Sequence, residues 1–188
     1  MSDAASPGSS LDFAARHVAQ AKLGHVLEFG VHYGDSLRLL ATLFRDKAEV
    51  YGFDSFAGLP SPWTGSMGQG AFGTGGAVPS IPGAVCHKGW FSETIPVYLT
   101  NSEHNAALIH TDSDVYESAR DVLFGLDGRI VAGTVVVFDE MFGYPEWQQH
   151  EARAIDEWLA ARSRRIERIE YFDPTPAGSM RAIFRVLN

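Results

Sequence analysis

Residues Val26 to Ser36, VLEFGVHYGDS, predict a buried β-strand that turns on glycine and enters a helix. The turn uses Gly30 and Gly34, and Asp35 or Ser36 can cap the helix, whose apolar residues recur at helical spacing. A strand, a glycine turn and a helix N-terminus together form a place where a ligand can lie against the backbone.

The rest of the chain alternates strand-like and helix-like runs. Residues 49–53 predict a second strand that ends in Asp54, which gives a βαβ unit with parallel strands. Further strands are predicted at 84–88, 106–111, 134–138, 165–172 and 180–187, and helices at 10–22, 92–99, 116–126 and 146–162. The turn-rich link between the last two strands suits an antiparallel pair. We therefore expect an α/β fold with a Rossmann-like, doubly wound sheet in a three-layer sandwich.

One long segment has no regular pattern. From Gly58 to Gly83 the chain contains eight glycines and four prolines, which excludes a regular element and leaves two interpretations, a lid over a substrate and a flexible loop. The remainder predicts a single domain, 10–188, preceded by a disordered leader, 1–9.

Composition limits the class of partner. A formal net charge of -8 argues against a nucleic-acid partner, because proteins that bind the phosphate backbone usually carry a basic patch. No run is apolar and long enough to span a bilayer, and the polar leader lacks the apolar core of a signal peptide, so we expect a cytoplasmic protein without a membrane partner. The single cysteine, Cys86, excludes an intrachain disulfide and is predicted to be buried and inert.

Ligands of a doubly wound sheet bind beyond the carboxyl ends of its strands. The residues that follow the predicted strands are mostly acidic or aromatic, and they should meet at one edge of the sheet: Glu28, Asp54, Trp90, Phe91, Asp112, Asp114, Asp139 and Glu140. This edge is the predicted site.

The first turn argues against a dinucleotide. The pattern G-x-G-x-x-G needs a glycine where a pyrophosphate approaches the helix, and His32 occupies that middle position. Glu28 would repel a phosphate, yet it suits an ammonium group. A ligand with a nucleoside at one end and a cationic amino acid at the other fits better than NAD, and S-adenosylmethionine is that ligand.

The other donor contacts follow from the neighbouring strand ends. Asp54 lies at the end of the second strand, where a carboxylate can accept both hydroxyls of a ribose. Trp90 and Phe91 could flank an adenine ring, although such a pair is also typical of a core. We also assign Ser36 and Ser55, which lie next to these positions, to the donor pocket.

A second acidic group predicts a cation. Asp112, Asp139 and Glu140 follow two strands that should be neighbours, and converging carboxylates are typical ligands of Mg²⁺ or another divalent cation. The alternative is that some of these side chains cap helices, and Asp114 is the predicted cap of the helix at Tyr116.

Methyl transfer needs an aligned and activated hydroxyl. A metal bound by Asp112 beside the donor would lower the pKa of a substrate hydroxyl and align it with the sulfonium. His150, early in a predicted helix, is the candidate catalytic base, whereas His110 lies within a strand and is expected in the core.

Five blocks of the sequence, in order, resemble the macrocin O-methyltransferase family of class I S-adenosylmethionine-dependent enzymes. These blocks are LEFGVHYGDS, VYGFDSFAGLP, KGWFSETIP, HTDSDVYESARDVL and VVVFDE. The resemblance implies a seven-stranded sheet whose last strand is antiparallel, and O-methylation of a hydroxyl on a sugar or other small natural product. It also implies a divalent metal near Asp112 and Asp139 and donor contacts at Glu28, Gly30, Gly34 and Asp54. Glu140 stands where related enzymes generally have Asp or Asn.

Two other functions remain open from the sequence. One is a non-catalytic module that binds S-adenosylmethionine without turnover, and the other is a nicotinamide-dependent oxidoreductase, which His32 disfavours. The expected partner is a small hydroxyl-bearing substrate. A homodimer is a further possibility, with Trp63 and Phe72 of the long loop packed on a second subunit.

Overall fold

A computed structural model of the protein describes residues 7–18, 24–171 and 180–188. Within these residues the strands form one seven-stranded sheet in the order β3-β2-β1-β4-β5-β7-β6. The strands, in chain order, are β1 His25–Phe29, β2 Val50–Asp54, β3 Ala84–Lys88, β4 Ala106–Thr111, β5 Val135–Phe142, β6 Ile166–Tyr171 and β7 Met180–Val186. Only β7 runs antiparallel to its neighbours, β5 and β6, so the predicted fold is confirmed.

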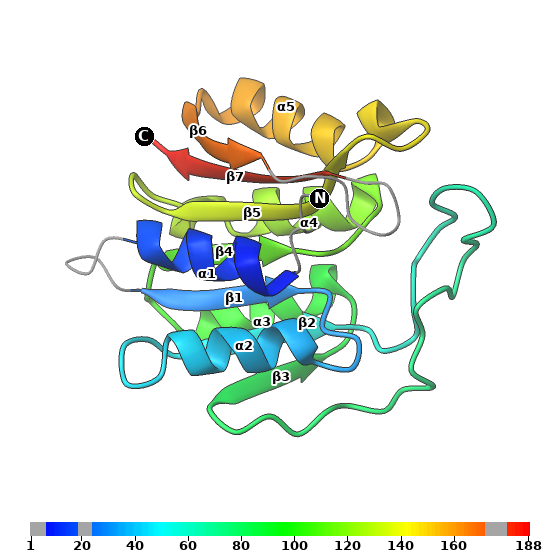
Figure 1. Ribbon diagram of the computed structural model, residues 1–188, viewed down its shortest axis with the longest axis horizontal. Helices are drawn as coiled ribbons and strands as arrows, with labels where there is room; N and C mark the ends of the chain where they lie inside the picture. Colours follow the sequence, from blue (N-terminus) through cyan, green and yellow to red (C-terminus); the bar gives the residue numbers. More distant parts are fainter. Residues whose placement is uncertain (1–6, 19–23, 172–179) are drawn as a thin grey trace, which may run out of the picture.

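Helices cover both faces of this sheet (Figure 1). On one face α1 (Pro7–His17) and α2 (Asp35–Leu43) place Leu11, Leu37 and Leu40 against the strands. The other face is covered by α3 (Phe91–Asn101), α4 (Tyr116–Gly125) and α5 (Glu151–Arg162). Short 3₁₀ turns η2 (Asp127–Arg129) and η3 (Trp147–Gln149) join the elements. None of the described helices is long and apolar enough to cross a membrane.

Burial follows position in the sheet. Every residue of β1 and β4 is buried, as expected for central parallel strands that are covered on both faces. The edge strand β3 contains only half-buried and exposed residues. Cys86 in this strand is half-buried rather than buried, and partial burial raises the pKa of its thiol, so the predicted low reactivity still follows.

Several boundaries differ from the prediction, and three of these differences lie near the functional edge or the predicted leader. Helix α1 begins at Pro7, so residues 7–9 belong to the helix, while the rest of the predicted leader lies outside the described residues. Strand β5 continues to Phe142 because its pairing with β7 resumes there beyond an irregularity. Helix α5 begins at Glu151, preceded by η3. Asp139 and Glu140 therefore lie within a strand and not beyond its end.

The glycine-rich loop between β2 and β3 has a defined fold, which Figure 1 shows beside the carboxyl edge of the sheet. Backbone hydrogen bonds join Leu59 to Ala71 and Trp63 to Met67, each at 2.9 Å. Trp63 is buried in a small cluster with Leu59, Val115 and Tyr144. The indole thus packs within its own chain, and the possible homodimer stays a prediction.

Candidate active site

A cavity of about 540 Å³ opens at the carboxyl edge of the sheet. Its walls come from the ends of strands β1, β2, β4 and β5, the start of α3, one side of α4 and the glycine-rich loop. This volume lies in the range of small-molecule sites. The cavity is lined by eight of the predicted site residues: Gly30, Asp54, Ser55, Trp90, Phe91, Asp112, Asp139 and Glu140.

Gly30 lets two strand ends close on each other. It has φ +97°, and a Cβ placed there would come within 1.8 Å of the carbonyl oxygen of Asp112. The backbone N–H of Asp112 donates to the carbonyl of Phe29 at 2.8 Å. Glycine is therefore required at this position by the packing of β1 against the end of β4.

Gly34 and Ser36 are not among the residues that line the cavity, and their predicted contact with the donor stays a prediction. Gly34 is the N-cap of α2 with φ 84°, and a Cβ there would lie 2.4 Å from Ile81 of the long loop. Its role is to let that loop pack on the helix start.

Asp54 joins two turns of the cavity wall. One carboxylate oxygen accepts the backbone N–H groups of Val31 and His32, both at 2.8 Å, and the other accepts the N–H of Phe56 at 2.6 Å. The side chain thus fixes the backbone of the first turn, where His32 has φ 51°. Its predicted contact with a ribose stays a prediction.

Glu28 is fully buried and is not among the residues that line the cavity, and its predicted contact with an ammonium group stays a prediction. The side chain is fully buried, and its Oε1 lies 2.8 Å from Nδ1 of His110. Nε2 of His110 lies 3.6 Å from Asp139, an ion-pair distance. Although burial acts the other way, these two carboxylates raise the pKa of His110 to about 10. The core position predicted for His110 is confirmed.

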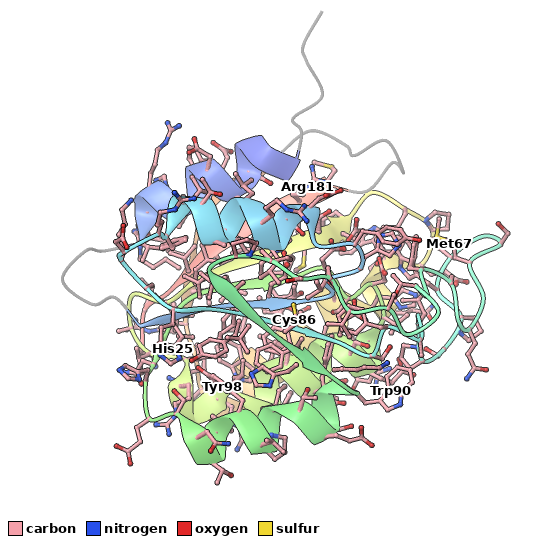
Figure 2. The ribbon with its side chains drawn as sticks, turned by 90° about the horizontal axis from the view of Figure 1, so that it is seen from below. His25, Met67, Cys86, Trp90, Tyr98 and Arg181 are labelled. Atoms are coloured by element: carbon pink, nitrogen blue, oxygen red, sulfur yellow. The ribbon has the colours of Figure 1, made fainter. Side chains whose placement is uncertain are left out.

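Asp139 is held by a cation of the protein itself. Arg181 of β7 donates from Nε to Oδ1 at 2.5 Å and from Nη2 to Oδ2 at 3.0 Å. Both side chains are buried, and despite burial the hydrogen bonds with His110 and Arg181 lower the pKa of Asp139. Figure 2 labels Arg181 on its strand. Because Arg181 already neutralises this carboxylate, the structure gives no support to its predicted role as a metal ligand.

The carboxylates that do converge are Asp112, Asp114 and Glu140, with oxygen atoms within 4.8 Å of one another. Burial and mutual repulsion raise the pKa of Asp112 and Glu140, and burial raises that of Asp114 to about 7. Oε2 of Glu140 is buried without a hydrogen-bond partner among the described residues. Asp114 has φ 63° and precedes Val115, the N-cap of α4, so its predicted capping role is wrong.

His150 does not line the cavity. It is the N-cap residue of α5, and its ring centroid lies 6.1 Å from that of Tyr144. Burial lowers the pKa of His150. Its position therefore gives no support to the predicted role as catalytic base.

Aromatic and apolar side chains form the opposite walls. Trp90 is 40% exposed, while Phe91 packs edge-on against Phe29 with ring centroids 5.2 Å apart. The loop adds Leu59, Pro60, Trp63, Met67 and Phe72. Figure 2 shows Trp90 and Met67 on the loop side of the molecule.

Sequence reasoning missed one wall altogether. Helix α4 contributes Glu117, Ser118 and Asp121, and the turn before it contributes Ser113. Oγ of Ser61 in the loop donates to Glu117 at 3.3 Å and so joins the loop to this helix. The available signal was the spacing of Glu117 and Asp121, which places two carboxylates on one helix face directly after Asp114.

Comparisons with known proteins agree with this geometry. The family described as a methyltransferase domain matches residues 27–141. The calicheamicin methyltransferase CalS11 superimposes with a TM-score of 0.74 and 25% identity over 95% of this chain and 77% of that chain. A second structure of CalS11, described as a TDP-rhamnose 3'-O-methyltransferase, gives 0.67 and 26% over 95% and 78%.

Two more distant structures show the fold. The O-methyltransferase NovP has a TM-score of 0.72 and 21% identity over 96% of this chain and 79% of that chain. An O-methyltransferase from Bacillus cereus, solved in complex with SAH, has a TM-score of 0.63 and 14% identity over 100% and 84%. A search of curated protein sequences finds no significant match.

Proposed function

We propose, from the premise that this chain belongs to the methyltransferase domain family, that it is an S-adenosylmethionine-dependent O-methyltransferase of a small hydroxyl-bearing molecule. One observation carries the proposal. A single cavity joins an aromatic wall at Trp90 and Phe91 to a cluster of converging carboxylates at Asp112, Asp114 and Glu140. Family membership argues against the alternative of a nicotinamide-dependent oxidoreductase.

The donor is assigned to the half of the cavity formed by the ends of β1, β2 and β3. Gly30, Asp54 and Ser55 lie at these strand ends, and Trp90 offers a ring face to an adenine. The Bacillus cereus structure, which shares the fold, was solved with SAH, the product form of this donor. We extend the assignment to the macrocin O-methyltransferase group on the sequence blocks quoted above.

The carboxylate cluster fits a divalent cation such as Mg²⁺. The donor set consists of oxygen atoms, and Oε2 of Glu140 is buried without a partner among the described residues. Asp112, Asp114 and Glu140 would hold the ion. When bound, such a cation supplies a Lewis acid that lowers the pKa of a coordinated hydroxyl.

The chain's own residues position the reactants. The loop wall at Trp63 and Phe72 restricts water, and the carboxylates orient the acceptor hydroxyl. The hydroxyl oxygen forms a bond to the methyl carbon while the carbon–sulfur bond breaks, and its electron pair remains on sulfur. The hydroxyl proton passes to a cluster carboxylate or to water, and the products are a methyl ether and S-adenosylhomocysteine.

Calorimetry with S-adenosylhomocysteine tests the donor assignment. We expect micromolar binding by the wild type and at least about tenfold weaker binding by Trp90→Ala, because a stacked ring contributes roughly 1–2 kcal/mol. Val97→Ala, which truncates an exposed side chain of the same helix, is the matched control and should bind like the wild type. If the wild type does not bind S-adenosylhomocysteine, the proposal is wrong.

Metal dependence separates an enzyme from a module that only binds the donor. We expect methyl transfer to stop in EDTA and to return with excess Mg²⁺, measured by mass spectrometry of the acceptor. Donor binding without transfer to any acceptor would favour the non-catalytic module.

A further inference from the structure

We propose that the acceptor carries a protonated amine near its reacting hydroxyl and carries no phosphate group. The inference rests on the proposed function, since it assigns a substrate class to the acceptor half of the same cavity. It also separates this chain from CalS11, which is described as acting on TDP-rhamnose, a phosphate-bearing sugar.

The charged side chains that line the cavity are almost all acidic. Of its described lining residues seven carry carboxyl groups, and His32 alone can carry a positive charge: Asp54, Asp112, Asp114, Glu117, Asp121, Asp139 and Glu140 are the seven. Outside the described ranges only Lys22 has a basic side chain, and it precedes the amino end of β1 in the sequence. No Lys or Arg of the described chain lines the cavity.

Bound ligands do not reverse this charge. Asp139 is neutralised by Arg181, which leaves six of the seven carboxyl groups. A divalent cation and a donor of net charge +1 together add about three positive charges, fewer than the six carboxylates can carry. Carboxyl groups that stay protonated make the wall less negative, but none of them becomes positive.

Helix N-termini, which often bind phosphate, are already occupied by acidic side chains at this cavity. Asp114 and Glu117 flank the start of α4. At the start of α3, Oε2 of Glu93 accepts the backbone N–H of Trp90 at 3.4 Å. A diphosphate would therefore meet repulsion at both helix starts.

An amine finds the opposite environment. Glu117 and Asp121 lie on one wall, and the rings of Trp63 and Phe72 lie on the loop, a combination that stabilises an ammonium group through charge and cation–π contact. The hydrogen bond from Ser61 holds Glu117 at the cavity. Two buried lining groups, Glu140 Oε2 and Ser113 Oγ, have no hydrogen-bond partner among the described residues, so polar ligand atoms are expected beside them.

Probes that share a catechol ring and carry a cationic, a neutral or an anionic substituent test the proposal. Calorimetry on protein saturated with S-adenosylhomocysteine and Mg²⁺ compares dopamine, 4-methylcatechol and 3,4-dihydroxyphenylacetate, with TDP-rhamnose as the phosphate-bearing probe. We expect dopamine to bind at least about tenfold more tightly than the anion and TDP-rhamnose not to bind at about 1 mM. Added salt should weaken dopamine binding.

The variant Asp121→Asn tests whether the wall formed by α4 causes the preference for a cationic ligand. This near-isosteric change should reduce the ratio of dopamine to 3,4-dihydroxyphenylacetate affinity about three- to tenfold and leave S-adenosylhomocysteine affinity unchanged. Glu103→Gln removes the same charge at an exposed position before β4 and should leave the ratio unchanged.

The outcomes are distinguishable. Binding of TDP-rhamnose, equal affinity for the three catechols, or no binding of dopamine to the loaded protein would overturn the amine proposal while the methyltransferase stands. Failure of S-adenosylhomocysteine itself to bind would overturn the proposed function and this inference with it.

Discussion

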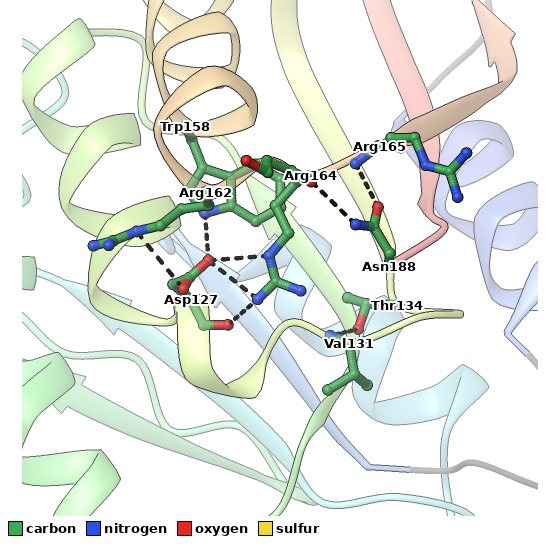
Figure 3. Close-up of polar contacts among 9 residues, drawn as sticks. Asp127, Val131, Thr134, Trp158, Arg162, Arg164, Arg165 and Asn188 are labelled. Atoms are coloured by element: carbon green, nitrogen blue, oxygen red, sulfur yellow. Dashed lines mark hydrogen bonds and ion pairs between the residues drawn. The ribbon is translucent and has the colours of Figure 1, made fainter.

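Carboxylates at the two edges of the sheet have opposite surroundings. At the end of the sheet away from the cavity, Asp127 accepts hydrogen bonds from Trp158 Nε1 at 2.9 Å and from Nε and Nη2 of Arg164, each at 3.2 Å (Figure 3). Arg162 adds an ion pair at 3.7 Å. At the cavity, Asp112, Asp114 and Glu140 face one another, and no Lys or Arg of the described chain joins them in the lining.

The difference separates structural carboxylates from functional ones. A carboxylate with protein donors stabilises the fold, whereas converging carboxylates repel each other until a ligand supplies positive charge. Asp139 shows that the cavity edge can also hold a paired carboxylate, because Arg181 reaches it from β7. Removing a paired carboxylate should therefore lower the free energy of unfolding, whereas removing an unpaired buried one should raise it.

The largest effect is expected at the buried pair. Arg181→Met should lower the free energy of unfolding by about 3–5 kcal/mol, because the buried charge of Asp139 loses the guanidinium that donates two hydrogen bonds to it and keeps only the longer contact with His110. Urea denaturation measures the change. Arg185→Met on the same strand, which breaks an exposed pair with Glu167, should cost less than about 1 kcal/mol. Equal losses in both variants would contradict the distinction.

Glu151 gives a pH-dependent effect of the opposite sign. Burial and the nearby Asp114 raise its pKa to about 8, although Thr111 Oγ1 donates to Oε1 at 2.9 Å. The folded state therefore holds an extra proton between about pH 4.5 and 8, and stability falls as pH rises through this window.

Glu151→Gln should remove the part of this fall that Glu151 causes, which makes the variant roughly 2–4 kcal/mol more stable than the wild type near pH 8.5. Urea denaturation in EDTA at pH 5 and pH 8.5 measures it, with the exposed Glu103→Gln as control. A wild-type stability that does not fall between these pH values would refute the assignment.

Asp127 should behave as a structural carboxylate. Asp127→Ala leaves the indole N–H of Trp158 and the guanidinium of Arg164 without this acceptor, so we expect a loss of about 2–3 kcal/mol by urea denaturation. Asp156→Ala, an exposed change on α5, should cost less than about 0.5 kcal/mol. A stability gain in Asp127→Ala would place this residue with the cavity group instead.

The smallest effect concerns the cation. Mg²⁺ at ten times its dissociation constant should raise the free energy of unfolding by about 1.4 kcal/mol. Glu140→Gln should reduce this response, because one of three converging ligands is lost. Thermal unfolding with and without Mg²⁺ measures it, and an equal response in both proteins would exclude the cluster as the binding site.

The fold could be predicted from the sequence because each strand and helix has a clear local pattern. The apolar runs at Ala84–Lys88 and Ala106–Thr111 appear in the structure with the same bounds. Helix α3 forms although Pro96 weakens its local pattern, since Ile95 and Tyr98 are buried against the sheet.

The site could be predicted only in part, because strand ends locate an edge but not the direction of a side chain. Glu28 and Asp139 lie near the predicted edge, yet pairing with His110 and Arg181 is a long-range property that local pattern does not reveal. The same holds for Glu117 and Asp121, whose wall exists only because α4 packs beside the end of β4.

The residues that line the cavity come from two kinds of segment in the sequence. Gly30, Asp54 and Asp112 come from separate strand ends that the whole sheet holds in place, whereas Leu59, Trp63 and Phe72 belong to one contiguous loop between β2 and the edge strand β3. Replacement of this one segment would therefore change the loop wall of the cavity and leave the residues at the strand ends unchanged. Such modularity gives evolution, or an engineer, a short segment in which to change specificity without rebuilding the fold.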